Sequence, residues 1–217
     1  MKKFLFPLLT LLVLTSCSSK PELREDIKQF ISQFSLETAM NEYKSGGYTS
    51  TTVDTTEGKE VKTVITLEYS RVDENHPTYE MVTTVSENDV VTSNVEVRFA
   101  EIDDEYYLIT NDESEKSSLK EVNGLITKFF YETEPVEGYH ERGQYYGDLL
   151  KETSYKYQSF ITIDQENELY ILKGTVKVSG VTQRQNYSVN KFGMLVENHS
   201  VTENDVRSVV QDIYVHN

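Results

Sequence analysis

The spacing of apolar residues divides the chain into helical and extended stretches. Apolar side chains recur every three or four residues over residues 23–34, which predicts an amphipathic helix on one face. This helix can continue until the Gly46-Gly47 dipeptide stops it. From Tyr48 onward the period changes to two, which predicts β-strands.

The first strand series has one apolar face and one polar face. Short turn-like segments rich in Asp, Asn and Pro separate the strands, as in an antiparallel meander. The side chains predicted to share the apolar face are Val61, Thr63, Ile65, Leu67 and Tyr69, then Tyr79, Met81, Thr83 and Val85, and then Val91, Val95, Val97 and Phe99.

The same order of elements occurs again after the polar linker 111–118. Residues 119–130 have helical spacing, and residues 144–151 could form a further short helix. A second strand series is predicted to begin at Tyr155 and Tyr157 and to continue to Val215. The apolar side chains of the 119–130 helix are Leu119, Val122, Ile126, Phe129 and Phe130.

A short repeat relates the two series. Val85-Ser-Glu-Asn-Asp-Val90 recurs as Val201-Thr-Glu-Asn-Asp-Val206, each time between two predicted strands. The repeat fits an old duplication, and it fits equally a favoured hairpin turn that is used twice.

These patterns predict an α+β fold. We expect a large curved antiparallel sheet, like a half-open barrel, with two or three helices packed on one face and two similar helix-plus-meander halves. The predicted boundaries are a cleaved signal peptide at 1–16, a lipidated cysteine with a tether at 17–21, and a single domain at 22–217 with halves 22–111 and 112–217.

The first seventeen residues have the order of a secretory signal. Two lysines precede an apolar run that is too short to span a membrane, which takes about 20 residues. Leu14-Thr15-Ser16-Cys17 resembles the bacterial lipobox, in which small residues precede a cysteine. The resemblance implies that the Cys17 thiol receives a diacylglycerol and that the chain is cut before Cys17. The alternative is an ordinary signal peptide with a chance cysteine at its boundary.

Charge and cysteine content narrow the classes of partner. The chain has 36 acidic and 21 basic residues, a net charge of −15, and this balance argues against nucleic acid and anionic lipid headgroups as partners. Cys17 is the only cysteine, so its lipidation would leave no thiol for a disulfide, a nucleophile or a metal site. Membrane contact is therefore expected through the acyl chains.

No catalytic or metal-binding motif occurs in the sequence. The four histidines form no short-spaced pair, and Tyr139-His140-Glu141 is the only local group that resembles a site. The carboxylates lack the spacing of a calcium loop. We therefore expect a protein that is not an enzyme and that needs no cofactor or metal.

Aromatic residues are the remaining candidates for binding. Phe129 and Phe130 are adjacent on a helix and point about 100° apart, so one of them could face a ligand cavity. Tyr145 and Tyr146 could line the same cavity, since tyrosine combines apolar contact with a polar tip. The alternative for all four residues is packing in the core.

The order of elements over residues 22–217 resembles the LolA/LppX-like lipid carriers, which are extracytoplasmic lipoproteins. The resemblance implies a cavity between sheet and helices for an acyl chain or another apolar ligand. We therefore expect a lipid-anchored, non-catalytic binding module or carrier, held on the cell membrane or outer membrane and facing away from the cytoplasm. The alternative is an envelope interaction protein that binds another protein through its sheet face or edge.

Overall fold

The computed structural model describes residues 22–130, 144–178, 181–203 and 206–217. In these residues the helices are α1 (Glu25–Ile31), α2 (Leu36–Glu42), α3 (Leu119–Phe130) and α4 (Gly147–Tyr157), and a 3-10 turn (Gln158–Phe160) follows α4. The strands are β1 (Ser45–Thr56), β2 (Lys59–Ser70), β3 (Thr78–Glu87), β4 (Val90–Ile102), β5 (Glu105–Thr110), β6 (Glu113–Lys116), β7 (Ile161–Asp164), β8 (Leu169–Val178), β9 (Val181–Asn190), β10 (Leu195–Glu203) and β11 (Arg207–His216).

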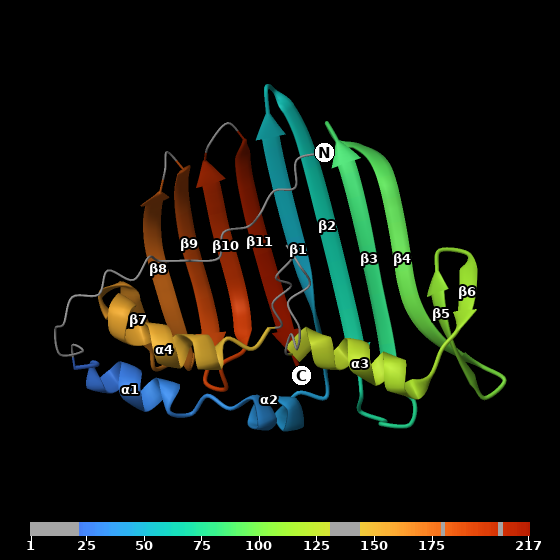
Figure 1. The fold of residues 1–217 in the computed structure, drawn as a ribbon, viewed down its shortest axis with the longest axis horizontal. Coiled ribbons are helices and arrows are strands. Elements are labelled where there is room, and N and C mark those ends of the chain that lie inside the picture. Colours follow the sequence, from blue (N-terminus) through green and yellow to red (C-terminus); the bar gives the residue numbers. More distant parts are fainter. Residues whose placement is uncertain (1–21, 131–143, 179–180, 204–205) are drawn as a thin grey trace.

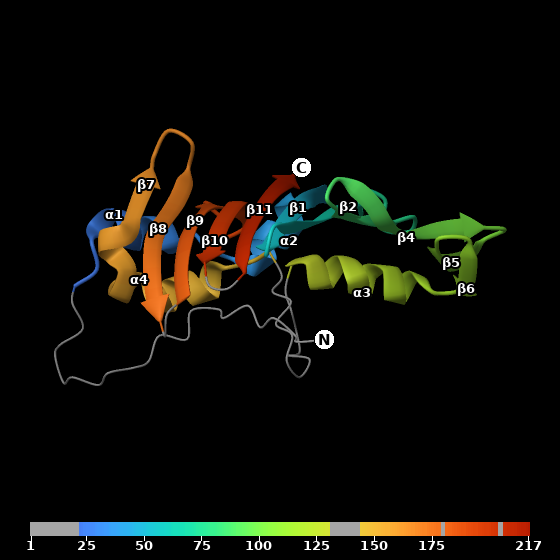
Figure 2. The ribbon, with the colours of Figure 1, turned by 90° about the horizontal axis from the view of Figure 1, so that it is seen from above.

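The strands form one antiparallel sheet in the order β6-β5-β4-β3-β2-β1-β11-β10-β9-β8-β7 (Figure 1). The two strand series meet where β1 pairs with β11, from Gly46 opposite His216 to Thr55 opposite Arg207. The sheet is curved (Figure 2). It is also open, because the edge strands β6 and β7 lie at opposite ends of the strand order and do not pair. This architecture confirms the predicted α+β fold with a large curved antiparallel sheet.

Two-residue turns fix the register of the first meander. Glu57-Gly58, Asn88-Asp89 and Asp103-Asp104 each connect two paired strands, and both residues of each turn have positive φ, between 47° and 79°. Such turns match the right-handed twist of the flanking strands, and Asn, Asp and Gly tolerate the left-handed conformation best. The turn signals in the sequence therefore set which face each side chain occupies.

The helices lie toward one end of the strands. Helices α3 and α4 cross one face of the sheet near the strand ends that are drawn at the bottom of Figure 1. Helices α1 and α2 lie along the same strand ends, which we call the lower edge of the sheet (Figures 1 and 2). Although α1 comes first in the chain, it contacts α4 and β7 of the second series, while α3 contacts β3 of the first series. Helices and strands that are distant in sequence are thus packed together.

The helices and strands pack into two hydrophobic cores. Burying a large apolar side chain contributes roughly 1.5–3 kcal/mol, so each core is a major source of stability. The α1–α4 core contains Leu23, Ile27, Phe30, Ile31, Phe34, Leu150, Ile161, Tyr170, Val189 and Leu195. The α2–α3 core contains Ala39, Leu67, Tyr69, Tyr79, Val122, Ile126, Phe129, Phe130, Tyr145 and Met194.

The number of helices differs from the prediction of two or three. The predicted first helix is divided into α1 and α2, because the Ser35 side chain accepts a hydrogen bond of 3.2 Å from the Thr38 backbone N–H and caps a new helix. Apolar spacing continues across the break, since Phe34 is still buried, and spacing alone therefore did not reveal it.

Two further assignments were wrong. Tyr155 and Tyr157 belong to α4 and not to a strand, because Leu150 and Ser154, four residues apart, form the buried side of a helix there. The predicted linker 111–118 contains the short edge strand β6, whose residues are all exposed and therefore carry no apolar signal. No helix in the described ranges is both long and apolar enough to cross a membrane.

Candidate functional site

The predicted ligand-binding phenylalanines are part of a packed aromatic cluster. Phe129 is 6% exposed, and its ring centroid lies 4.8 Å from that of Tyr69 and 6.1 Å from that of Tyr48. Phe130 is fully buried, 5.7 Å from Tyr69, with the Arg71 guanidinium 4.9 Å above its ring. Both rings therefore contact packed side chains of the α2–α3 core.

The structure separates the two predicted tyrosines. Tyr145 packs in the α2–α3 core, where its backbone N–H donates to the Phe130 carbonyl at 3.0 Å, and burial raises its pKa to about 12. Tyr146 packs against the α1–α4 core, with its ring 6.1 Å from that of Tyr187. Three of the four aromatic residues are thus brought together, but as core residues. Cys17 lies outside the described residues.

The histidines that the structure describes form no metal site. His76 is exposed and lies 2.6 Å from Glu101, and hydrogen bonding to this carboxylate raises its pKa. His216 packs on Tyr43 at 4.9 Å, and burial lowers its pKa. Among the described residues no group of three or more His, Cys, Asp or Glu side chains could hold a metal ion. The Tyr139-His140-Glu141 group lies outside these residues.

The two sheet faces can be assigned from side-chain alternation. We call the face that packs against α3 the inner face; it carries Tyr48, Leu67 and Tyr69. The opposite, outer face carries the alternate residues of the same strands. The helices contact only the lower part of the inner face, and its upper part is the candidate functional site.

Strands β2, β3 and β4 carry a group of aliphatic side chains above the helices. This aliphatic patch consists of Val61, Ile65, Val85, Val95 and Val97, which the strand register places on the inner face with Thr63 and Thr83 between them. All five side chains are half-buried, yet none belongs to either core or to the side chains packed against it. The patch is therefore an apolar surface on the concave side of the sheet.

Strands β9, β10, β11 and β1 carry polar side chains at the same height. This polar belt consists of Ser50, Thr52, Gln185, Asn198, Ser200 and Asp212, with Val210 as an apolar residue among them. Ser200 is 2% and Asp212 is 9% exposed. The Asn198 side-chain amide donates to Asp212 at 2.8 Å, and the Tyr214 hydroxyl donates to the same carboxylate.

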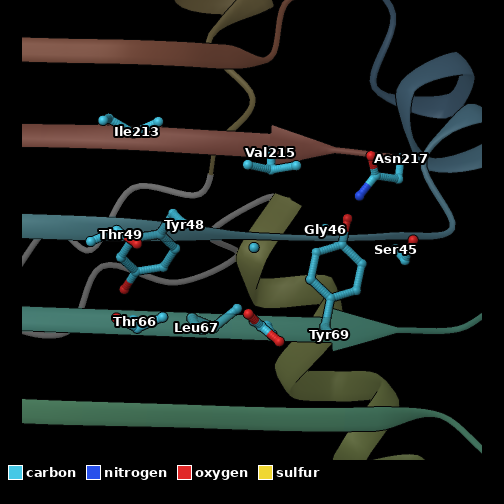
Figure 3. A pocket seen from close by; sticks show the side chains of 12 residues that line it. Ser45, Gly46, Tyr48, Thr49, Thr66, Leu67, Tyr69, Ile213, Val215 and Asn217 are labelled. Carbon is cyan, nitrogen blue, oxygen red and sulfur yellow. The ribbon is translucent and has the colours of Figure 1, made fainter.

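A groove of about 370 Å³ lies where β11, β1 and β2 meet near the lower edge (Figure 3). Its outer-face residues include Gly47, Thr49, Glu68, Ile213 and Val215. Ile213 and Val215 are 49% and 52% exposed. Gly47 lies between Glu68 and Val215 in the register, and the Leu67 backbone would collide with a Cβ atom at this position.

The sequence pattern identified the apolar side chains of the aliphatic patch and placed them on the apolar face of the first meander. It missed the polar belt. The signal for the belt was the carboxylate Asp212 in the amphipathic run before Tyr214, at a position where alternation demands an inward side chain. No protein-family model matches this sequence, and no curated protein matches it. The inner face is therefore the basis for the functional interpretation.

Proposed function

We propose that this protein is a lipid-anchored, non-catalytic binding module or carrier for an apolar ligand such as a lipid, held on the outer side of a cell membrane through Cys17. The observation that carries this proposal is the aliphatic patch, whose side chains are half-buried on a concave surface and packed against neither core. An alkyl chain laid on the patch would remove apolar area from water. Each Å² buried in this way would contribute about 25 cal/mol to the binding free energy.

The packed rings of Phe129 and Phe130 limit where such a chain binds. Because both are in the α2–α3 core, the ligand would rest above α3, with the helix as the lower boundary of its site. The α+β fold supports the proposal, because its open curved sheet leaves an apolar surface that the helices do not fill.

The proposed anchor would hold the domain close to the bilayer. The tether of residues 18–21 spans at most about 14 Å when fully extended, so the domain beginning at Glu22 would lie directly on the membrane surface. A binding module at this distance could take a lipid from the membrane or deliver one to it.

The test compares valine-to-threonine pairs on opposite faces of the same sheet. A fluorescent alkyl probe with an uncharged head is titrated into the full chain and into the Val85→Thr/Val95→Thr variant. Placing two hydroxyls on the patch should weaken binding roughly thirtyfold, since each costs about 1 kcal/mol of apolar contact.

The control is the Val64→Thr/Val82→Thr variant, which makes the same changes at half-buried outer-face positions of β2 and β3. It should bind the probe like the parent. Mass spectrometry of lipids that co-purify with the native protein identifies the ligand. A parent protein that binds no alkyl probe and carries no lipid would contradict the proposal.

A second candidate function rests on the outer-face groove. Exposed Ile213 and Val215 beside Glu68 would suit another envelope protein that binds the sheet face. Replacing Ile213 with Lys should then abolish cross-linking to that protein in cells while leaving alkyl-probe binding unchanged.

A further inference from the structure

The polar belt and the aliphatic patch share one surface. Cross-strand pairing places Asn198, Asp212, Ser50 and Ile65 in one row on β10, β11, β1 and β2. Neighbouring strands lie about 4.8 Å apart, so Asp212 and Ile65 are separated by about 10 Å across the sheet. A single amphiphilic molecule is long enough to contact both regions.

Asp212 is a buried carboxylate whose charge is not balanced by a cation. Asn198 and Tyr214 supply two neutral donors, whereas a carboxylate has about four acceptor positions. Among the described residues, Asp212 forms no ion pair, and no Lys, Arg or His occupies the inner-face positions of β9, β10, β11 and β1 at the height of the belt. A buried charge is costly unless it is paired.

We infer that the polar belt receives the head group of the ligand and that Asp212 selects a cationic head, specifically an alkylammonium. This inference rests on the proposed function, because the alkyl chain of the same molecule would occupy the aliphatic patch. Of its three N–H groups, the ammonium would donate one to Asp212 and the other two to the hydroxyl oxygens of Ser50 and Thr52 on the neighbouring strand β1. Charge-assisted hydrogen bonds of this kind are about twice as strong as neutral ones.

The experiment measures head-group preference in the full chain. Decylammonium, decanol and decanoate have the same alkyl chain, and each displaces a fluorescent alkyl probe in a competition titration. We expect decylammonium to bind at least about tenfold more tightly than decanoate, since a carboxylate head would meet the Asp212 charge. Asp212→Asn should reduce this ratio to near one.

Two controls separate Asp212 from the overall charge of −15. Glu197→Gln makes the same charge change at an exposed outer-face position of β10, and it should keep the preference. The parent should also keep most of its preference in 0.5 M salt, because exposed charges are screened and buried pairs much less so. The salt measurement tests the inference even if Asp212→Asn does not fold.

The outcomes distinguish the two proposals. Binding of decanol without a preference for decylammonium, or a preference that salt removes, overturns the role of Asp212 and leaves the apolar-ligand function standing. A preference that survives Asp212→Asn also overturns it. Failure of all three compounds to bind overturns both proposals.

Discussion

The hydroxyl oxygen of Tyr69 lies 3.3 Å from the point where a Cβ atom at residue 46 would stand, and residue 46 is a glycine. The Val215 carbonyl oxygen lies even closer to the same point. Figure 3 shows the ring of Tyr69 on β2 reaching toward Gly46 on β1. The close packing of β11, β1 and Tyr69 therefore requires a residue without a side chain at position 46.

Replacing Gly46 with Ala should destabilise the fold. Its methyl group would collide with backbone and with a buried ring, and such overpacking costs about 1–3 kcal/mol. Chemical denaturation measures the change in the free energy of unfolding. Gly174→Ala in β8 is the matched control, because nothing lies within 4 Å of its Cβ position, and it should be neutral or slightly stabilising. Equal stability of the two variants would contradict this account.

Helix α1 is expected to be an integral part of the fold. Phe30 is 5% exposed and packs on Phe34 and Tyr170, with ring centroids 5.9 and 6.5 Å away. Phe30→Ala should therefore cost about 3–5 kcal/mol, which a thermal melt detects readily. The exposed neighbour Gln29→Ala should change little. A melt unaffected by Phe30→Ala would indicate instead that this helix lies on the membrane surface.

Phe129 and Phe130 should both prove to be structural. Each ring is buried among other aromatic side chains, so Phe129→Ala and Phe130→Ala should each lower the free energy of unfolding by about 3–5 kcal/mol. Lys128→Ala, at an exposed position of the same helix, serves as the reference. If one phenylalanine can be removed at little cost in stability while alkyl-probe binding changes, that ring contacts the ligand.

Acid should destabilise the protein through His216. Its Nε2 lies 2.7 Å from the Leu195 carbonyl, its Nδ1 has no partner among the described residues, and burial lowers its pKa. The unfolded chain takes up a proton near pH 6.5 but the native state only at lower pH, so stability falls as pH falls below about 6.5 and levels off below the lowered pKa.

Equilibrium unfolding between pH 7 and pH 5 measures this loss. His216→Asn should flatten the slope relative to the parent. His76 acts in the opposite direction: its pKa is raised by Glu101, so its contribution is present at low pH and is lost as pH rises through that pKa. A slope that His216→Asn leaves unchanged would exclude His216 as its source.

Cys17→Ser should release the protein from the membrane or leave it as an uncleaved precursor. Two or three acyl chains hold a protein firmly, at about 0.8 kcal/mol per buried CH₂, whereas without them the proposed anchor is lost. Fractionation of cells followed by an immunoblot gives both the location and the length of the chain. A Cys17→Ser protein that is processed normally and stays in the membrane fraction would show that lipidation is not the anchor.

The sequence by itself determined the class of fold and the face of most strands. Period-two alternation from Val61 to Phe99 and turn pairs such as Asn88-Asp89 are local signals, because side-chain direction and turn geometry depend on neighbouring residues. The buried stripe of Leu23, Ile27 and Phe30 was predictable for the same reason. Lipidation of Cys17 stays a prediction from the sequence alone.

Only the tertiary structure decided which elements meet. Nothing local to α1 shows that it packs on β7 of the second series, and nothing local to Phe129 or Phe130 shows that Tyr48, Tyr69 and Arg71 fill the space around them. The polar belt likewise exists only because β1 pairs with β11 and brings Ser50 beside Asp212, 162 residues later in the chain. Pairing over such separations depends on long-range packing and loop closure, to which the sequence pattern of a single element is insensitive.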